Sequence, residues 1–249
     1  MSRNFELLQN LGREPKLFAS AAFPALEVAE RPALKVFANE RGADPEINQL
    51  CQRLFAGGAD AADARVVTFC SVQPAVLQGE ICARTAMTLA ACVNRSVCVV
   101  DSNLLAPSLH KFFGVSNQSG FSEAAMSDSA LSSHARQIGD SNLALITAGG
   151  AVSDLHAAQS ESTAFRLREL RSHFDYILIN GPTLPDRGQG IFLGRLSDGI
   201  VLILEANSTR RDTAMRVRFE MEQADVPVLG AVLNNRTFPI PDALYSKLF

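Results

Sequence analysis

The stretch RVVTFCSVQPAVLQGEICARTAMTLAACVNRSVCVVD (65–101) holds an apolar run, a loop, a helical segment and a second apolar run. The two runs, Val66–Cys70 and Val97–Asp101, are apolar on both faces, which is typical of parallel strands covered by helices on each side. Glu80–Val93 lies between them and has the length and composition of a helix. This order predicts two parallel strands joined by a crossover helix.

The same alternation continues to the end of the chain. Further strands are predicted at Leu143–Thr147, Tyr176–Asn180, Gly199–Leu204 and Val228–Leu233, and further helices at Ser162–Ser172 and Arg210–Ala224. The sequence therefore predicts an α/β fold, a doubly wound and mostly parallel sheet with helices on both faces, like that of phosphate-loop NTPases.

The chain divides near residue 44. Residues 1–43 show scattered proline, alanine and charge without a sustained period, which favours an extended N-terminal arm or linker. Residues 44–249 form the predicted α/β domain. It opens with a helix that Asp44 caps and Pro45 begins, and Gly57-Gly58 follows that helix.

Composition excludes several classes of protein. The 249 residues are 47% hydrophobic and 20% charged with a net charge of −3, so nothing electrostatic favours nucleic acid or an anionic membrane as partner. No apolar run reaches the roughly 20 residues of a membrane span, and the N-terminus lacks a signal-peptide core. These features predict a cytoplasmic protein without direct membrane insertion. Its five cysteines form no C-x-x-C pair, which favours buried thiols over disulfides or zinc.

The loop after the first strand lacks the residues of a working phosphate loop. Such a loop needs glycines that turn backbone amides toward phosphate, a lysine for the phosphate charge and a Ser or Thr for magnesium. Here Gly79-Glu80 is followed by Ile81, Cys82 and Ala83. In this register, Cys82 carries no charge at the lysine position and Ala83 has no oxygen for a metal.

The segment VCVVDSNLLAPSLHKFFGVSNQSGFSE (97–123) joins a strand ending in Asp to a P-S-L-H-K-F-F-G run and a Gly-Phe-Ser segment. Together with FDYILINGP (174–182), SDGIVLILEANSTRRD (197–212) and LGAVLNN (229–235), it resembles the cytoplasmic kinase domain of bacterial capsule and exopolysaccharide tyrosine autokinases. The resemblance runs from about Glu46 to Asn235.

Each catalytic motif of that family is altered in this sequence. The family's G-E-G-K-S/T-T reads Gly79-Glu80-Ile81-Cys82-Ala83-Arg84, after a loop that looks several residues too long. The D-x-D-x-R motif keeps Asp101 but has Asn103 and Leu105. In the third motif Asn180 replaces the carboxylate that organises magnesium through water. By the same resemblance, Asn234 matches the asparagine that reads the adenine base.

These departures predict a pseudoenzyme: a non-catalytic scaffold or regulatory pseudokinase of exopolysaccharide production that has lost ATP and magnesium binding. Narrower roles stay open for single residues. Arg84 reaches a phosphate in one interpretation, the amides at the helix start hold a small anion in another, and Cys82 acts as a redox sensor in a third. The enzymatic alternative is a divergent protein-tyrosine kinase or ATPase that uses Arg84 and Asp101. A relative of the partitioning ATPases is a third hypothesis, and the P-S-L-H-K-F-F-G run counts against it.

The resemblance also implies partners. The expected partner is a membrane chain-length or export protein, which would bring the chain peripherally to the inner membrane. Self-association is expected through helix 46–55, where the family has E-x-x-R-x-x-R. This chain keeps Glu46 but has Gln49 and Gln52, which weakens charged contacts between subunits. The C-terminal segment offers Tyr245 alone in place of a tyrosine cluster.

Overall fold

The structure is a computed structural model that describes residues 44–55, 64–74, 77–127, 129–150, 159–184 and 187–235, the side chain of residue 187 excepted. The predicted arm 1–43, the Gly57-Gly58 helix end and the segment that contains Tyr245 lie outside the described residues. None of the helices in the described part has the length and apolarity that a membrane span requires.

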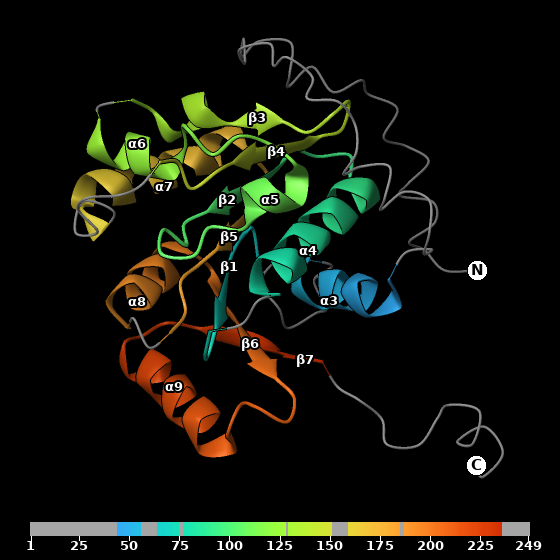
Figure 1. The fold of residues 1–249 in the computed structure, drawn as a ribbon, viewed down its shortest axis with the longest axis vertical. Helices are drawn as coiled ribbons and strands as arrows, with labels where there is room; N and C mark the ends of the chain where they lie inside the picture. The colour runs from blue at the N-terminus through green and yellow to red at the C-terminus, as the bar shows by residue number, and fades with distance from the viewer. Residues whose placement is uncertain are drawn as a thin grey trace, which may run out of the picture.

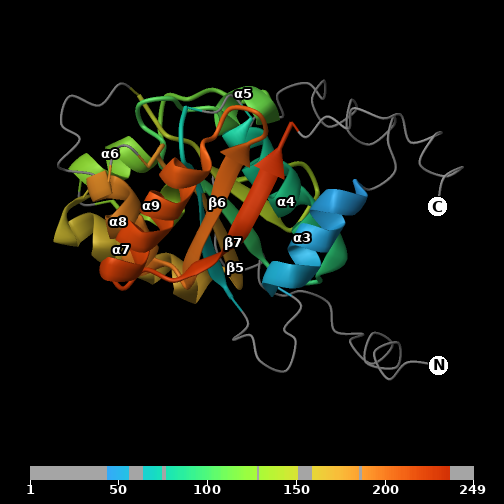
Figure 2. The same cartoon turned by 90° about the horizontal axis from the view of Figure 1, so that it is seen from below.

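Seven strands form one sheet in the order β3-β4-β2-β5-β1-β6-β7 (Figures 1 and 2). The strands are β1 (Val66–Ser71), β2 (Val97–Asp101), β3 (Arg136–Gln137), β4 (Leu143–Ile146), β5 (Tyr176–Asn180), β6 (Gly199–Glu205) and β7 (Val228–Asn234). All neighbouring pairs are parallel except β3 with β4, which is antiparallel. The doubly wound, mostly parallel sheet is therefore confirmed.

Helices cover both faces of the sheet, as Figure 1 shows. They are α3 (Pro45–Phe55), α4 (Gln78–Cys92), α5 (Leu109–Phe113), α6 (Phe121–Met126), α7 (Glu161–His173), α8 (Arg187–Leu196) and α9 (Arg211–Gln223), with a 3₁₀ turn at Leu131–His134. One apolar core packs α3, α4 and α5 against the sheet, and two more pack the other face with α6, α7, α8 and α9. Alternate strand residues enter opposite cores: Val99 faces α4, whereas Cys98 and Val100 face α7.

The cysteines agree in part with the sequence analysis. Cys51, Cys70, Cys82 and Cys98 are buried free thiols, whereas Cys92 near the end of α4 is exposed. Burial raises the pKa of Cys51 to about 12. The prediction of buried thiols is therefore confirmed for four cysteines and wrong for Cys92, which lies where α4 leaves the core.

Candidate functional site

The candidate site lies where three adjacent strands end and α4 begins. Asp101 is the last residue of β2, Asn180 is the last residue of β5, and the two are paired in register. Strand β1 lies next to β5 and leads through residues 72–77 into α4. In a doubly wound sheet, ligands bind in the crevice outside such carboxyl ends.

Asp101 is fully buried and accepts hydrogen bonds from several donors. Its Oδ2 accepts from the backbone N–H groups of Ser108 and Leu109, both at 2.9 Å, and its Oδ1 accepts from Asn180 Nδ2 at 2.8 Å. Burial raises the pKa of the Asp101 carboxyl, and these hydrogen bonds act in the opposite direction. No ion pair with Asp101 is formed by the described residues. The site therefore holds one buried carboxyl group without a cation beside it.

Gln78, the first residue of α4, links this carboxyl pair to β1. Its side chain is almost fully buried: Nε2 donates to Asn180 Oδ1 at 3.0 Å and to the Phe69 carbonyl at 3.1 Å. The same amide donates to the carbonyl of Gly181, and Oε1 accepts from Ser71 N–H at 3.1 Å. Gln78 thus ties the carboxyl ends of β1 and β5 together, and Asn180 connects it to Asp101.

The position of Gln78 changes the register predicted for the loop. Cys82 and Ala83 were predicted at the lysine and hydroxyl positions, but both side chains are fully buried in the core beneath α4. Helix α4 begins at Gln78, so residues 81–83 already lie one turn inside the helix and face the sheet. Burial raises the pKa of Cys82 well above its ordinary value, which removes the basis for a reactive thiolate.

Shifting the predicted register back by four residues brings Gln78 to the lysine position and removes the excess loop length. Gly79 then takes the position of the metal-binding hydroxyl. The sequence analysis missed Gln78, and the surplus length of the loop was the signal that would have revealed it.

Asn103 and Leu105 have local roles. The Asn103 backbone N–H donates to Asp101 Oδ1 at 3.3 Å, and Asn103 Oδ1 accepts from Ala106 N–H at 3.1 Å. Asn103 therefore shapes the turn after β2. Leu105 is 65% exposed, so the position of the family's arginine points to solvent.

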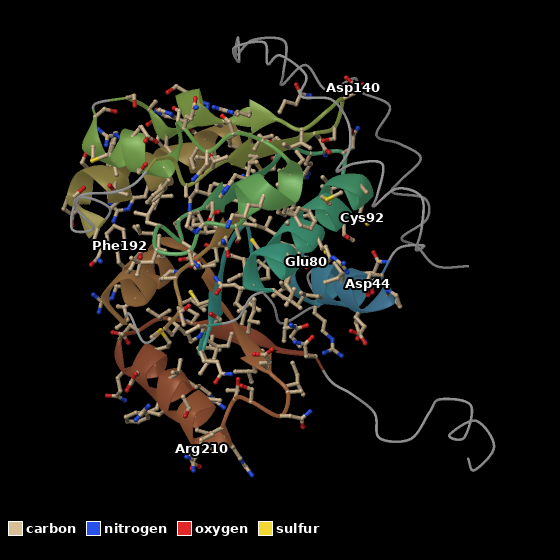
Figure 3. All side chains as sticks on the ribbon, in the orientation of Figure 1. Asp44, Glu80, Cys92, Asp140, Phe192 and Arg210 are labelled. Carbon is tan, nitrogen blue, oxygen red and sulfur yellow. The ribbon has the colours of Figure 1, made fainter. Side chains whose placement is uncertain are left out.

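The remaining predicted residues line a separate groove. Glu80, Arg84 and Asn234 border a cavity of about 390 Å³ between α3, the start of α4 and the end of β7. Arg84 pairs with Glu80 at 2.6 Å and with Asp44 at 3.5 Å. Figure 3 labels Glu80 on α4 and Asp44, the residue before α3, and both border this groove. Arg84 is thus held by two carboxylates on the side of α4 that faces α3.

The described residues contain no group of three or more His, Cys, Asp or Glu side chains arranged to hold a metal ion. A cation at the site would have to use hydroxyl, amide and phosphate oxygens in addition to the Asp101 carboxylate. The start of α4 offers donors for an anion, because Leu77 before it provides no side-chain cap for the first amides.

No family model matches the chain. Among curated proteins it is 27% identical over 139 residues to the putative tyrosine-protein kinase CapB of Staphylococcus aureus, covering 55% of this chain and 60% of CapB. It is 22% identical over 143 residues to the tyrosine-protein kinase YwqD of Bacillus subtilis, covering 57% and 60%. It is 23% identical over 188 residues to the succinoglycan biosynthesis transport protein ExoP of Rhizobium meliloti, covering 74% and 23%. The chain thus matches about three fifths of the two kinases and about a quarter of ExoP.

Solved structures agree on the fold. The chimerical protein CapA2B2 superposes with a TM-score of 0.74 at 17% identity, over 83% of this chain and 91% of that one. The kinase domain of the Escherichia coli tyrosine kinase ETK gives 0.64 at 20% identity, over 71% and 70%. A putative plasmid partition protein of Borrelia burgdorferi bound to AMPPNP gives 0.52 at 17% identity, over 74% and 80%.

These comparisons correct two predictions. The prediction that the chain is not an enzyme is wrong, because the relatives are tyrosine-protein kinases. The prediction that ATP and magnesium are lost is wrong for the same reason, since phosphoryl transfer by such kinases uses both. Both wrong predictions rested on substitutions at single motif positions. The substitutions in the loop were also assigned in a register four residues too far along the chain.

Proposed function

We propose, since this chain is a homologue of the bacterial tyrosine kinases of capsule and exopolysaccharide production, that it is a divergent kinase or ATPase domain with an atypical nucleotide site. The observation that carries this proposal is the buried network of Gln78, Asn180 and Asp101 at the start of α4. In the proposed register, this network would correspond to the lysine and the acidic strand ends of a phosphate-loop protein.

The residues at this site could hold a nucleotide, but they carry less charge than those of a standard phosphate loop. The first backbone amides of α4 would hold the phosphates, and Asp101 and Asn180 would lie on the magnesium side. Bound magnesium would neutralise charge on the transferred phosphate. Gln78 is neutral, and its side-chain N–H groups already donate to acceptors within the protein. It therefore does not supply the charged hydrogen bond to phosphate that lysine makes, which is worth about 1.5–3 kcal/mol. We therefore expect weaker nucleotide binding than in a lysine-containing loop.

Calorimetric titration of the full chain with ADP and Mg²⁺ tests this proposal. Gln78→Lys is expected to tighten ADP binding about 10-fold, because about 1.4 kcal/mol is one decade in affinity. Gln73→Lys is the matched control: it adds the same charge on the same loop, but the Gln73 side chain is half-buried and bonds Ser208, not the strand ends of the site. Absence of ADP binding by both the wild type and Gln78→Lys at millimolar ADP would overturn the proposal.

Phosphoryl transfer is the second readout. We expect the wild type to transfer the γ-phosphate of ATP to a tyrosine-containing copolymer slowly, and Asp101→Asn to abolish the transfer. Asp101 is the carboxylate at the site, so it is the group that would accept the proton of a tyrosine hydroxyl. Transfer that is equal in the wild type and Asp101→Asn would place the activity elsewhere.

A membrane export protein is the proposed partner. The match to ExoP supports this, since the chain corresponds to only 23% of that transport protein. The proposal places the chain at the cytoplasmic side of the inner membrane through this partner. Co-purification of the full chain with a membrane polysaccharide chain-length protein of the same organism is expected, and elution of the two proteins apart would contradict it.

Self-association through helix α3 is part of the same proposal. Glu46, Gln49 and Arg53 lie on its exposed side and border the groove beside α4. Light scattering of the wild type and of Arg53→Ala is expected to show an assembly that Arg53→Ala weakens. If light scattering shows a monomer at every concentration, the proposal that α3 is an assembly surface is contradicted.

A further inference from the structure

Gly79, the second residue of α4, has no room for a side chain. A Cβ built on it would lie 1.9 Å from Ser108 Oγ and 3.0 Å from Ser108 Cβ. The backbone of Gly79 is not among those with positive φ, so the glycine is required by close approach and not by a turn. The Ser108 hydroxyl therefore fills the space that a side chain of residue 79 would occupy.

Ser108 reaches this place from another segment. It ends the loop between β2 and α5, and its backbone N–H donates to Asp101 Oδ2 at 2.9 Å. That bond fixes the loop so that the hydroxyl faces α4. The side-chain amide of Asn180 donates to Ser108 Oγ at 3.4 Å and to Asp101 Oδ1 at 2.8 Å.

We infer that Ser108 supplies the metal-binding hydroxyl that a phosphate loop ordinarily carries on the residue after its lysine. With Gln78 at the lysine position, that residue is Gly79, which has no side chain. The Ser108 oxygen lies only slightly more than a covalent bond length from where the Cβ of residue 79 would be. A hydroxyl is thus present beside this position on α4, and the β2–α5 loop delivers it. This inference rests on the proposed function.

The surroundings select the class of ligand. Ser108 Oγ and the Asp101 carboxylate converge on one group with partial positive charge, the Nδ2 of Asn180. A hydroxyl and a carboxylate are hard oxygen ligands, which suit Mg²⁺ or Mn²⁺ and not a soft metal. With only one carboxylate, phosphate oxygens and water would complete the coordination, so ADP is expected to strengthen cation binding.

Mn²⁺ binding measured by electron paramagnetic resonance, without and with ADP, tests the role of Ser108 independently of activity. The full chain is expected to bind Mn²⁺ weakly alone and more tightly with ADP. Ser108→Ala is expected to weaken Mn²⁺ binding at least about 10-fold in both conditions, as ligand changes do in metal sites. Ser172→Ala is the matched control, because it removes an exposed serine hydroxyl on α7 that donates to the Glu169 carbonyl.

Moving the hydroxyl back to the helix gives the sharper test. Gly79→Ser alone is expected to lower the melting temperature, because its Cβ meets Ser108. Gly79→Ser with Ser108→Gly removes that collision and puts a hydroxyl on α4 in nearly the same place. This double variant is expected to regain Mn²⁺ affinity to within about 3-fold of the wild type, which is less than 1 kcal/mol.

The outcomes separate this inference from the proposed function. Wild-type Mn²⁺ affinity in Ser108→Ala, or a folded double variant that does not regain affinity, overturns the role of Ser108. If ADP binds with the same affinity with and without Mn²⁺, the proposed function is retained and the metal site is overturned. Mn²⁺ binding that Ser108→Ala weakens, in a protein that never binds ADP, supports Ser108 and overturns the nucleotide site.

Discussion

Asp101 and Asp198 lie at opposite ends of the sheet, and their carboxylates are held in different ways. Asp101 is fully buried, whereas Asp198 is half-buried. At the amino end, Asp198 accepts backbone N–H bonds from Arg65 at 2.7 Å and Val66 at 2.8 Å, and it pairs with Arg171 at 2.9 Å. At the carboxyl end, Asp101 also accepts backbone N–H bonds, but no cation pairs with it among the described residues.

The pKa directions follow from that difference. Burial raises the pKa of Asp198, but the backbone bonds and Arg171 outweigh it, so the net pKa is lowered. For Asp101, burial prevails and the pKa is raised. Charge compensation at the amino end stabilises the fold. The unpaired carboxyl at the other end costs stability when ionised, and such a cost is typical of a site that awaits a ligand.

The largest expected effect belongs to Asp101→Ala. It leaves buried N–H groups of Asn103, Ser108 and Leu109 without their acceptor, so we expect a loss of about 3 kcal/mol in the free energy of unfolding. Urea unfolding measures it. A loss below about 1 kcal/mol would mean that the loop bonds are replaced by other acceptors.

Asp198→Asn is expected to cost less, about 1 kcal/mol at pH 7, because the site is partly open to water. A lowered folded pKa stabilises above the ordinary value of 3.8, and this stabilisation is lost as the pH falls through the folded pKa. The deficit of Asp198→Asn should therefore shrink toward pH 3 in urea unfolding.

Asp101→Ala should show the opposite trend with pH. A raised folded pKa stabilises at low pH, and this contribution is lost as the pH rises from 3.8 through the folded pKa. Its deficit should be larger at pH 4 than at pH 8. Parallel trends for the two variants would contradict the comparison between the two ends.

Among the changes at the two ends of the sheet, Arg171→Met is expected to have the smallest effect. The Arg171 side chain is 38% exposed, so its pairing with Asp198 is worth about 0.5 kcal/mol. Arg218→Met is the control, since its i,i+4 pair with Glu222 lies on the exposed side of α9 and is worth about 0.3 kcal/mol. Thermal unfolding of each variant would measure both losses. A loss above about 2 kcal/mol for Arg171→Met would mean that the Arg171–Asp198 pair behaves as a buried ion pair, which would contradict this expectation.

The sequence was most informative where both faces of a strand are buried. The bounds of β2 and β5 agree residue for residue with the predicted Val97–Asp101 and Tyr176–Asn180. Short apolar runs such as these are typical of parallel strands that helices cover on both faces. Helix α8 was not predicted, because glycines lower its helix propensity. Gly190 and Gly194 are needed there: a Cβ on either would lie 2.5 Å or less from Leu184 or Val226.

The site was predicted only in part. Asp101 and Asn180 follow from strand ends, which any parallel sheet brings together. The role of Gln78 depends on acceptors on β5 about 100 residues away, and that of Ser108 depends on a loop folded against α4. Local patterns in a single sequence carry neither contact, and only the surplus length of the loop argued against placing the lysine position at Cys82.

The most direct test of the nucleotide site is a nuclear magnetic resonance titration of the full chain with ADP and Mg²⁺, following the side-chain amide signals of Gln78 and Asn180. The account predicts that both signals shift together and saturate, because their mutual bond lies where the phosphates would bind. Saturating shifts confined to residues away from the start of α4, or no shift at millimolar ADP, would contradict it.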